Sequence, residues 1–343
     1  RGQPGRLKKA KRPGECVSVD VMMSNVPGLI AQLRGIPTTD RYTGAVVFVD
    51  HYSDLSYTHL LRTADADSVI QAKEAFEAFA MFHGVQIKHY HADNGIFADN
   101  DWKEHIETSQ QTISYCGVNA HWQNGRVERM IQGLRTTARS QLLHARTRWN
   151  AVDARLWPYA LRSAQDLHNH VPIAGRGDLK SPMALFSGSE DETFRTKSYH
   201  TFGCPTYVLG TNYQAGEDYP HWDGRAYVGI NLGHSMQHAQ SVSLVLNPET
   251  GLTSPHYHVK HDDMFQTVKD IDLGTVTWQD RCHFTDKPFS EMREGNELPE
   301  EINARLTPGD APEDPVIAPR STPDTTTRFR RTSRRPAWHH AFV

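Results

Sequence analysis

The sequence contains no run of apolar residues approaching the 18 positions that a membrane-spanning helix requires, so no membrane contact is expected. It also has no GxxxxGK[ST] and no GxGxxG motif, so neither ATP nor a dinucleotide is indicated as a ligand. Cysteine is scarce. The four cysteines are widely scattered, and none forms a CxxC pair, which argues against a disulfide framework and against a zinc module.

Acidic and basic residues are nearly equal in number, with a net charge of −3, but they are concentrated in separate segments of the chain. Residues 1–12 hold six basic side chains and no acid. Residues 270–319 hold twelve acids and four bases, and residues 320–335 hold six arginines and one acid. Since a basic block can bind phosphate in a protein of slightly negative net charge, nucleic-acid binding is compatible with this composition.

Apolar periodicity predicts an α/β arrangement in the first half of the chain. Strands are predicted over residues 16–22, 44–49, 55–61, 85–91 and 112–116. Helices are predicted over residues 65–82, 99–108, 123–148 and 153–168. Three strands, a helix, a strand, a helix, a strand and two helices form an order similar to the ribonuclease H-like fold, with a generic α/β domain as the alternative.

The second half changes character. A period of two over residues 204–209, 225–231, 241–247 and 256–259 predicts a small antiparallel β domain. Beyond about residue 270 the composition is acidic, then rich in proline and threonine, then rich in arginine, which predicts disorder. The predicted organisation is a basic N-terminal arm (1–13), a catalytic core (14–170), a linker (171–198), a small C-terminal β domain (199–268) and a disordered tail (269–343).

Three acidic residues stand in distinctive settings. Asp20 lies in an apolar strand, Asp93 lies in His-Ala-Asp-Asn-Gly, and Glu128 lies in Gln-Asn-Gly-Arg-Val-Glu-Arg, 35 positions after Asp93. Carboxylates brought together from separate elements are what is needed to hold two Mg²⁺ ions for phosphodiester chemistry. The ordered set resembles the D,D,E core of retroviral integrases and, more closely, the integrase segment of copia-type LTR retrotransposon polyproteins.

The resemblance implies that Asp20, Asp93 and Glu128 are catalytic and bind the metal, with two Mg²⁺ (or Mn²⁺) ions as cofactors. The implied activity is a polynucleotidyl transfer that processes element cDNA ends and inserts them into host target DNA. Because two DNA ends must be held together, a homo-oligomer is expected. The implied location is the nucleus, after assembly in cytoplasmic particles, and the arginine-rich tail is a candidate for contact with chromatin or an import factor.

The helix predicted over residues 123–148 carries two separate stripes. Residues spaced for one apolar face predict its packing side: Val127, Ile131, Leu134, Ala138, Leu142 and Ala145. Arg135, Arg139 and Arg146 lie within about 20° of Glu128 on a neighbouring face. Together with Asn124 and Arg126 at the start of the helix, these arginines are the expected DNA contacts, with a solvated basic face as the alternative.

Asp50 is a rival to Asp20 for the first metal ligand, because it ends a more strongly apolar strand. Asp20 is favoured, since it lies within the first strand, where the ribonuclease H-like fold carries its first acid. Asp50, followed by His-Tyr-Ser, resembles a turn of structural importance in copia-type integrases. His91, two positions before Asp93, is a further candidate for contact with substrate or metal-bound water.

Two other functions remain open on the sequence. A ribonuclease H-like nuclease would share the fold and the carboxylates but would cleave without joining DNA. A catalytically decayed or domesticated integrase-like protein would bind DNA or chromatin without chemistry, although the intact Asp20, Asp93 and Glu128 count against it.

Overall fold

The computed structural model describes residues 9–117, 121–173, 179–189, 199–210, 224–235, 237–239, 241–271 and 277–284. The chain divides into two compact units, Arg1–Asp286 and Lys287–Val343, and all described residues belong to the first. The basic arm through residue 8 and most of the tail, including its arginine-rich part, lie outside the described residues.

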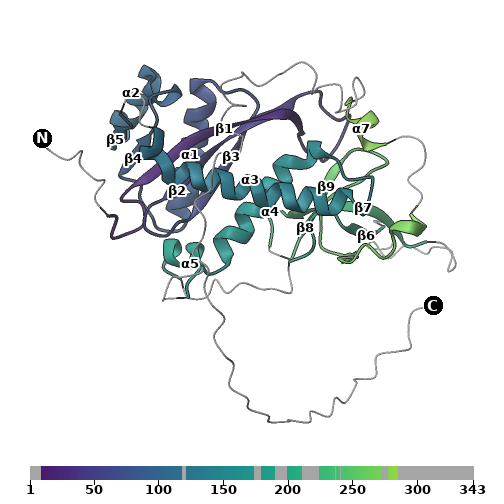
Figure 1. Ribbon diagram of the computed structural model, residues 1–343. Helices are drawn as coiled ribbons and strands as arrows, with labels where there is room; N and C mark the ends of the chain where they lie inside the picture. Colours follow the sequence, from purple (N-terminus) through teal and green to yellow (C-terminus); the bar gives the residue numbers. More distant parts are fainter. Residues whose placement is uncertain are drawn as a thin grey trace, which may run out of the picture. The chain divides into compact units, whose positions relative to one another are not determined.

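The first sheet has five strands: β1 (Val17–Leu29), β2 (Arg41–Asp50), β3 (Ser56–Leu61), β4 (His89–Ala92) and β5 (Thr112–Tyr115). Their spatial order is β3-β2-β1-β4-β5 (Figure 1). β1, β2 and β3 pair antiparallel, whereas β4 is parallel to both β1 and β5. This order and these directions, with a helix following β3, confirm the predicted ribonuclease H-like α/β fold.

Helices cover both faces of this sheet, as the burial of β2 shows. Val46 and Phe48 pack with α1 (Ala66–Phe82) and α2 (Asn100–Thr108). Ala45, Val47 and Val49 point the opposite way, toward α3 (Gly125–Arg146) and α4 (Trp157–His170). Because successive strand residues alternate between faces, a continuous apolar run is what a strand buried on both sides requires.

The long helix packs as its sequence predicts. The buried residues of α3 are the six of the predicted apolar stripe: Val127, Ile131, Leu134, Ala138, Leu142 and Ala145. Its start differs from the prediction, because a short 3-10 helix, η2 (His121–Asn124), precedes it. Asn124 gives its side chain to β1 and makes no capping hydrogen bond to α3, so the regular helix begins at Gly125.

The second sheet is antiparallel throughout. Its strands are β6 (Pro205–Leu209), β7 (Ala226–His234), β8 (Ser243–Leu246), β9 (Thr253–His256) and β10 (Val259–His261), in the order β10-β6-β7-β8-β9. The strand predicted over 256–259 is divided between β9 and β10. The sheet shares one hydrophobic core with α3 and α4, to which it contributes Ile230, Leu232 and Leu246.

Gly203 allows the close approach between this sheet and α3. Its φ of 76° lies in the left-handed region, where a side chain is disfavoured. A Cβ at this position would lie 2.7 Å from the Cβ of Ala145 on α3. The glycine therefore meets both a backbone and a packing requirement.

Short elements lie outside the predicted strands and helices. Within the predicted linker, α5 (Pro182–Ser187) buries Met183 and Phe186 against the α1 side of the first sheet. Beyond residue 268, η5 (Val268–Asp270) and α7 (Trp278–Arg281) follow, and Trp278 is 1% exposed. The packed part of the chain thus continues past residue 268, where the small β domain was predicted to end.

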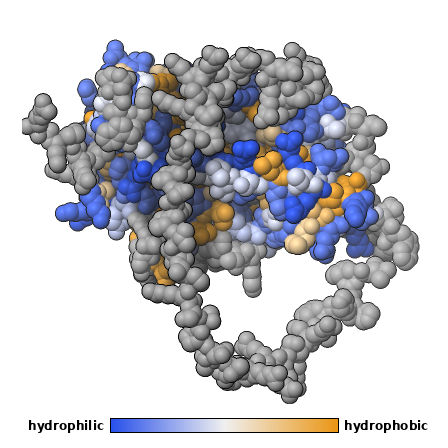
Figure 2. Space-filling view, in the orientation of Figure 1, coloured by the Kyte–Doolittle hydropathy of each residue, from blue (hydrophilic) through white to orange (hydrophobic). Residues whose placement is uncertain are grey.

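On the face that Figure 2 shows, the described residues form a mainly hydrophilic surface with hydrophobic patches between. Large apolar side chains such as Phe82, Ile36 and Met264 are exposed at separate points of the chain. No helix among the described residues is long and apolar enough to cross a membrane.

Candidate active site

The parallel pairing of β1 and β4 brings Asp20 and Asp93 to neighbouring positions. Val19 is paired with Ala92, so Asp20, which lies within β1, is next to Asp93, the first residue after β4. Both carboxylates are half-buried. The backbone N–H of Val21 donates to Asp20 Oδ1 at 2.8 Å, and that of Asn94 donates to Asp93 Oδ1 at 2.7 Å.

Glu128 reaches the same region through the anchored start of α3. The buried Asn124 donates from Nδ2 to the carbonyl oxygen of Val19, one residue before Asp20, at 3.1 Å. Gln123 Oε1 accepts from the N–H of Gly117, just beyond β5, at 2.9 Å. Glu128 lies in the first turn of α3 and is exposed. Two side-chain bonds therefore fix the helix end that carries it.

Cys116 lies within electrostatic reach of all three carboxylates. It follows β5, and its N–H donates to the carbonyl oxygen of Ala92 at 3.0 Å, which places it beside Asp93. Burial raises the pKa of its thiol, and the charges of Asp93, Glu128 and Asp20 raise it further. The thiol is thus within range of carboxyl charges from β1, from the segment after β4 and from α3.

His91 contacts side chains on β5 and directly after it. Its Nδ1 lies 2.8 Å from Ser114 Oγ on β5, and its Nε2 lies 3.6 Å from Cys116 Sγ. Burial lowers the pKa of the imidazole, which favours its neutral form. Both ring nitrogens of His91 are therefore engaged by side chains of the fold.

Asp50, the rival carboxylate, is fully buried and holds a turn. Its Oδ1 accepts from the N–H of Gly14, and its Oδ2 accepts from the N–H groups of Tyr52 and Ser53 and from the hydroxyl of Ser53. It pairs with Val17, at the opposite end of the β1–β4 ladder from Asp20. Burial raises its pKa and these hydrogen bonds oppose the rise.

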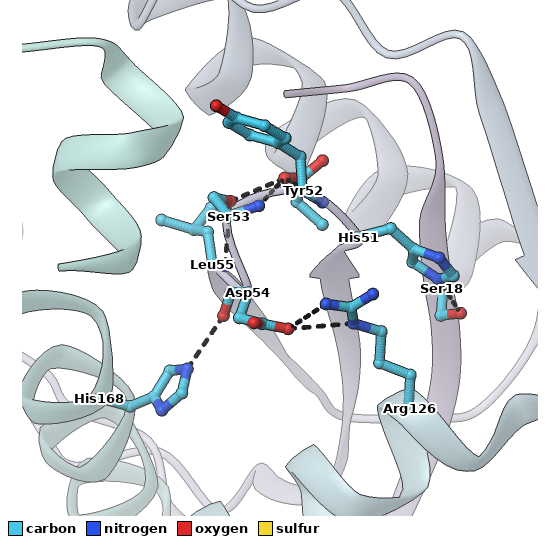
Figure 3. A network of polar contacts seen from close by, with 9 residues as sticks. Ser18, His51, Tyr52, Ser53, Asp54, Leu55, Arg126 and His168 are labelled. Carbon is cyan, nitrogen blue, oxygen red and sulfur yellow. Dashed lines mark hydrogen bonds and ion pairs between the residues drawn. The ribbon is translucent and has the colours of Figure 1, made fainter. Parts of the chain in front are cut away.

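Asp54, in the same turn, holds the side chain of Arg126 in place (Figure 3). Arg126 forms an ion pair with Asp54, with its Nε 3.0 Å from Asp54 Oδ1. The carbonyl oxygen of Asp54 lies 2.9 Å from His168 Nε2 on α4. Arg126 and Asn124, both expected to contact DNA, therefore make contacts inside the fold.

The three remaining arginines of the predicted track are on the surface. Arg135, Arg139 and Arg146 are exposed along α3. None of them has a hydrogen bond or an ion pair among the residues that the structure describes. Their charges are thus available to an anionic partner that lies along the face of α3 that carries Glu128.

The donor set of the site suits magnesium, since hard divalent cations prefer carboxylate oxygen ligands. Within the described ranges, no group of three His, Cys, Asp or Glu side chains is already assembled to hold a metal ion. One oxygen each of Asp20 and Asp93 is turned toward the following backbone N–H. The fit therefore lies in donor chemistry and position, and metal binding requires side-chain rotation.

Two features of this site, Cys116 and the ion pair between Asp54 and Arg126, were not predicted from the sequence. Cys116 is the last residue of the predicted fifth strand, so the strand prediction contained a usable signal for its position. The ion pair between Asp54 and Arg126 joins residues 72 positions apart and left no local signal.

No family model matches the chain, and no curated protein matches it in sequence. Among solved structures, it is similar to a chain of the simian T-cell lymphotropic virus intasome in complex with PP2A regulatory subunit B56 gamma. The identity is 15% and the TM-score 0.43, over 76% of this chain and 83% of that chain.

It is also similar to the HTLV-2 integrase catalytic core domain in complex with magnesium, in a dimeric and a trimeric form. The identities are 16% and 15% and the TM-scores 0.37 and 0.38, over 51% of this chain and 98% of each core domain. The similarity to retroviral integrase structures is thus one of low identity. The ribonuclease H-like class rests on the strand order, the strand directions and the two helical layers described above.

Proposed function

We propose that the chain is the integrase of a copia-type LTR retrotransposon, a Mg²⁺-dependent polynucleotidyl transferase that processes element DNA and inserts it into host DNA. The observation that carries the proposal is the parallel pairing of Val19 with Ala92, which sets Asp20 beside Asp93, while Asn124 anchors to β1 the start of the helix that presents Glu128. Three carboxylates held in this way would suit two-metal phosphodiester chemistry.

Asp20, Asp93 and Glu128 are the residues that would hold two Mg²⁺ ions. When bound, such ions lower the pKa of an attacking water or hydroxyl and stabilise the charge on the attacking and leaving oxygens. The protein's part is positional. The ladder between β1 and β4 fixes the two aspartates, and the bond from Asn124 to Val19 fixes the helix that presents Glu128.

The exposed Arg135, Arg139 and Arg146 would bind the phosphate backbone of the DNA on the face of α3 that begins with Glu128. The proposed partners are the element's cDNA ends and the host target DNA. Concerted insertion requires two ends at once, so we propose a homo-oligomer as the working form.

A strand-transfer assay tests the proposal. The full chain is incubated with Mg²⁺ or Mn²⁺, a duplex that ends in the element's own terminus, and a target duplex. Wild-type protein should join the two DNA molecules. Asp93→Asn and Glu128→Gln should lose joining by roughly a thousandfold or more and keep DNA binding, because each removes a ligand charge with little change in volume. Asp101→Asn, an exposed acid on α2, should retain activity.

The three candidate functions give different results in this assay. Joining supports the integrase. Cleavage without joining indicates a ribonuclease H-like nuclease. Binding without either reaction, in wild type and variants alike, indicates a DNA-binding protein that has lost catalysis and removes the two-metal proposal.

Nuclear entry is the corresponding proposal for location. Residues 328–335 contain five arginines, which is the composition of a basic import signal or a chromatin tether. Residues 320–343 fused to a fluorescent reporter should accumulate in the nucleus. A fusion that stays cytoplasmic would rule out the import role and leave the stretch as a connector in the polyprotein.

A further inference from the structure

A cavity of about 1160 Å³ lies apart from the candidate active site. Its walls come from α4, from β2 and β3, from the C-terminal end of α1 and from β7 to β9 of the second sheet. Asp20, Asp93 and Glu128 are not among its lining residues. Its size is that of a pocket for a small organic ligand.

Arg162 on α4 places an uncompensated positive charge on this cavity. The side chain is half-buried, and its Nε is buried without a hydrogen-bond partner. Across the described residues, its guanidinium makes no hydrogen bond and no ion pair. A buried charge of this kind is costly unless a counter-charge arrives.

Asp166, one helical turn further along α4, is the natural partner for Arg162, but its carboxylate is already engaged. Its Oδ1 lies 3.1 Å from His170 Nδ1, and its Oδ2 accepts a hydrogen bond from the hydroxyl of Tyr199. His234 Nε2 lies 3.8 Å from the same Oδ2. The structure thus directs the acid away from Arg162.

Two further polar groups on the cavity wall lack partners. Gln165, three residues after Arg162, is 8% exposed, and its Oε1 is buried without a hydrogen bond. Thr253 on β9 also lines the cavity, and its Oγ1 is buried without a hydrogen bond. Because nearly all buried polar groups in native proteins are hydrogen-bonded, three such groups on one cavity indicate a polar ligand.

Aromatic side chains lie beside the charge. Tyr57 and Phe79 both line the cavity, with ring centroids 5.2 Å apart. After burial itself, the charge of Arg162 is the next cause that lowers the pKa of His59, and it opposes the rise that burial causes in the pKa of Tyr57. The guanidinium therefore lies within electrostatic reach of the rings.

We propose that this cavity binds a small aromatic anion, with the anionic group on Arg162, a hydrogen bond to Gln165 and the ring against Tyr57 and Phe79. A carboxylate and a phosphate group share the required chemistry. Benzoate and phenyl phosphate distinguish them, and benzyl alcohol is the neutral match. The proposal is independent of the proposed integrase activity.

Calorimetric titration of the full chain with the three probes tests the site. We expect saturable binding of one or both anions and none of benzyl alcohol. Arg162→Met should weaken the binding by roughly tenfold or more, as loss of a charge-assisted bond does. Arg148→Met, at an exposed position outside the cavity, should bind as wild type does. Equal affinity in wild type and Arg162→Met, or no binding of either anion, would overturn the proposal.

Thermal unfolding without ligand supplies a second readout. Removal of an unpaired, half-buried charge should raise the midpoint in Arg162→Met by roughly 2–4 °C. Phenyl phosphate or benzoate should raise the midpoint of wild type and leave that of the variant unchanged. A lower midpoint in ligand-free Arg162→Met would show that Arg162 has a stabilising partner within the fold and would refute the proposed site.

Discussion

Asp20 and Asp50 lie on neighbouring strands and carry the same functional group in different surroundings. Asp20 is half-buried beside Asp93, whereas both oxygens of the fully buried Asp50 accept hydrogen bonds from the turn and from Gly14. At the scale of single residues, exposure and the number of N–H donors around a carboxylate therefore separate a candidate metal ligand from a structural acceptor.

Asparagine substitutions should separate the two roles. Asp20→Asn should abolish metal-dependent strand transfer and leave stability near that of wild type. Asp50→Asn should lower the free energy of unfolding by about 1–3 kcal/mol, because its amide group cannot accept from the donors that now bond to one of the oxygens. Urea unfolding and strand-transfer rates measure both effects. The reverse assignment, with activity lost and stability kept in Asp50→Asn, would make Asp50 the ligand.

His51 gives stability a pH dependence. Its Nε2 lies 2.7 Å from Ser18 Oγ, and burial, reinforced by the charge of Arg126, lowers its pKa from 6.5 to about 4. A depressed pKa in the folded state means that the unfolded chain binds the proton more tightly. The contribution of His51 to stability is therefore complete above pH 6.5 and is lost as the pH falls from 6.5 toward 4.

We expect wild-type protein to lose about 2–3 kcal/mol of unfolding free energy over this window through His51. His261, whose pKa burial also lowers to about 4, adds a loss in the same direction. His51→Gln keeps a hydrogen-bonding side chain but cannot titrate, so its stability should fall less steeply. Chemical denaturation at several pH values measures the slopes, and parallel slopes in the two proteins would refute this account.

At the scale of secondary structure, α3 combines three roles on two neighbouring faces. Its apolar stripe fixes the helix on the sheet, its first turn presents Glu128, and Arg135, Arg139 and Arg146 lie exposed beyond it. Arg126 does not belong to this exposed set, because it is paired with Asp54. A DNA contact along α3 therefore depends on the later arginines.

Arg135→Ala and Arg139→Ala should weaken DNA binding regardless of sequence. Removing one phosphate-binding arginine should make the slope of log affinity against log salt shallower by about one unit, because fewer counterions are released. Lys269→Ala, at an exposed position on η5, should leave affinity and slope unchanged. Binding isotherms at several salt concentrations provide the measurement. Wild-type affinity and slope in both arginine variants would identify a merely solvated basic face.

At the scale of the whole molecule, one hydrophobic core joins α3 and α4 to the second sheet and to the segment beyond it. Trp278 of α7 is 1% exposed, and its Nε1 donates to the carbonyl oxygen of Ala151, before α4, at 2.8 Å. Phe284 packs on Trp278, with ring centroids 5.9 Å apart. Residues past the second sheet thus contribute to the core beneath α4.

Trp278→Ala should therefore destabilise the packed unit by about 3–5 kcal/mol, the usual cost of deleting a large buried ring. Unfolding followed by circular dichroism and by fluorescence should give coincident transitions in wild type. His283→Ala, an exposed position nearby, should be close to neutral. A Trp278→Ala protein with wild-type stability would show that α7 is only loosely attached.

The sequence by itself determined the elements of the fold and the faces of α3. Burial on two sides of a sheet demands continuous apolar strands, and burial on one side of a helix demands a stripe, so both leave a periodic record in the residues. The predicted stripe of α3 and the predicted order of strands and helices along the first half of the chain agree with the structure for this reason. The three acids were proposed from their settings and from a family resemblance.

Only the tertiary structure decided which polar side chains remain available at the site. Asn124 bonds to a strand 105 positions away, Arg126 pairs across 72 positions, and the Cys116 thiol lies within electrostatic reach of carboxylates from three separate parts of the chain. Contacts of this kind depend on how distant elements pack together, and a polar residue carries no periodic mark that shows its partner. The same holds for Arg162, whose lack of a partner follows from the commitment of Asp166 to His170 and Tyr199.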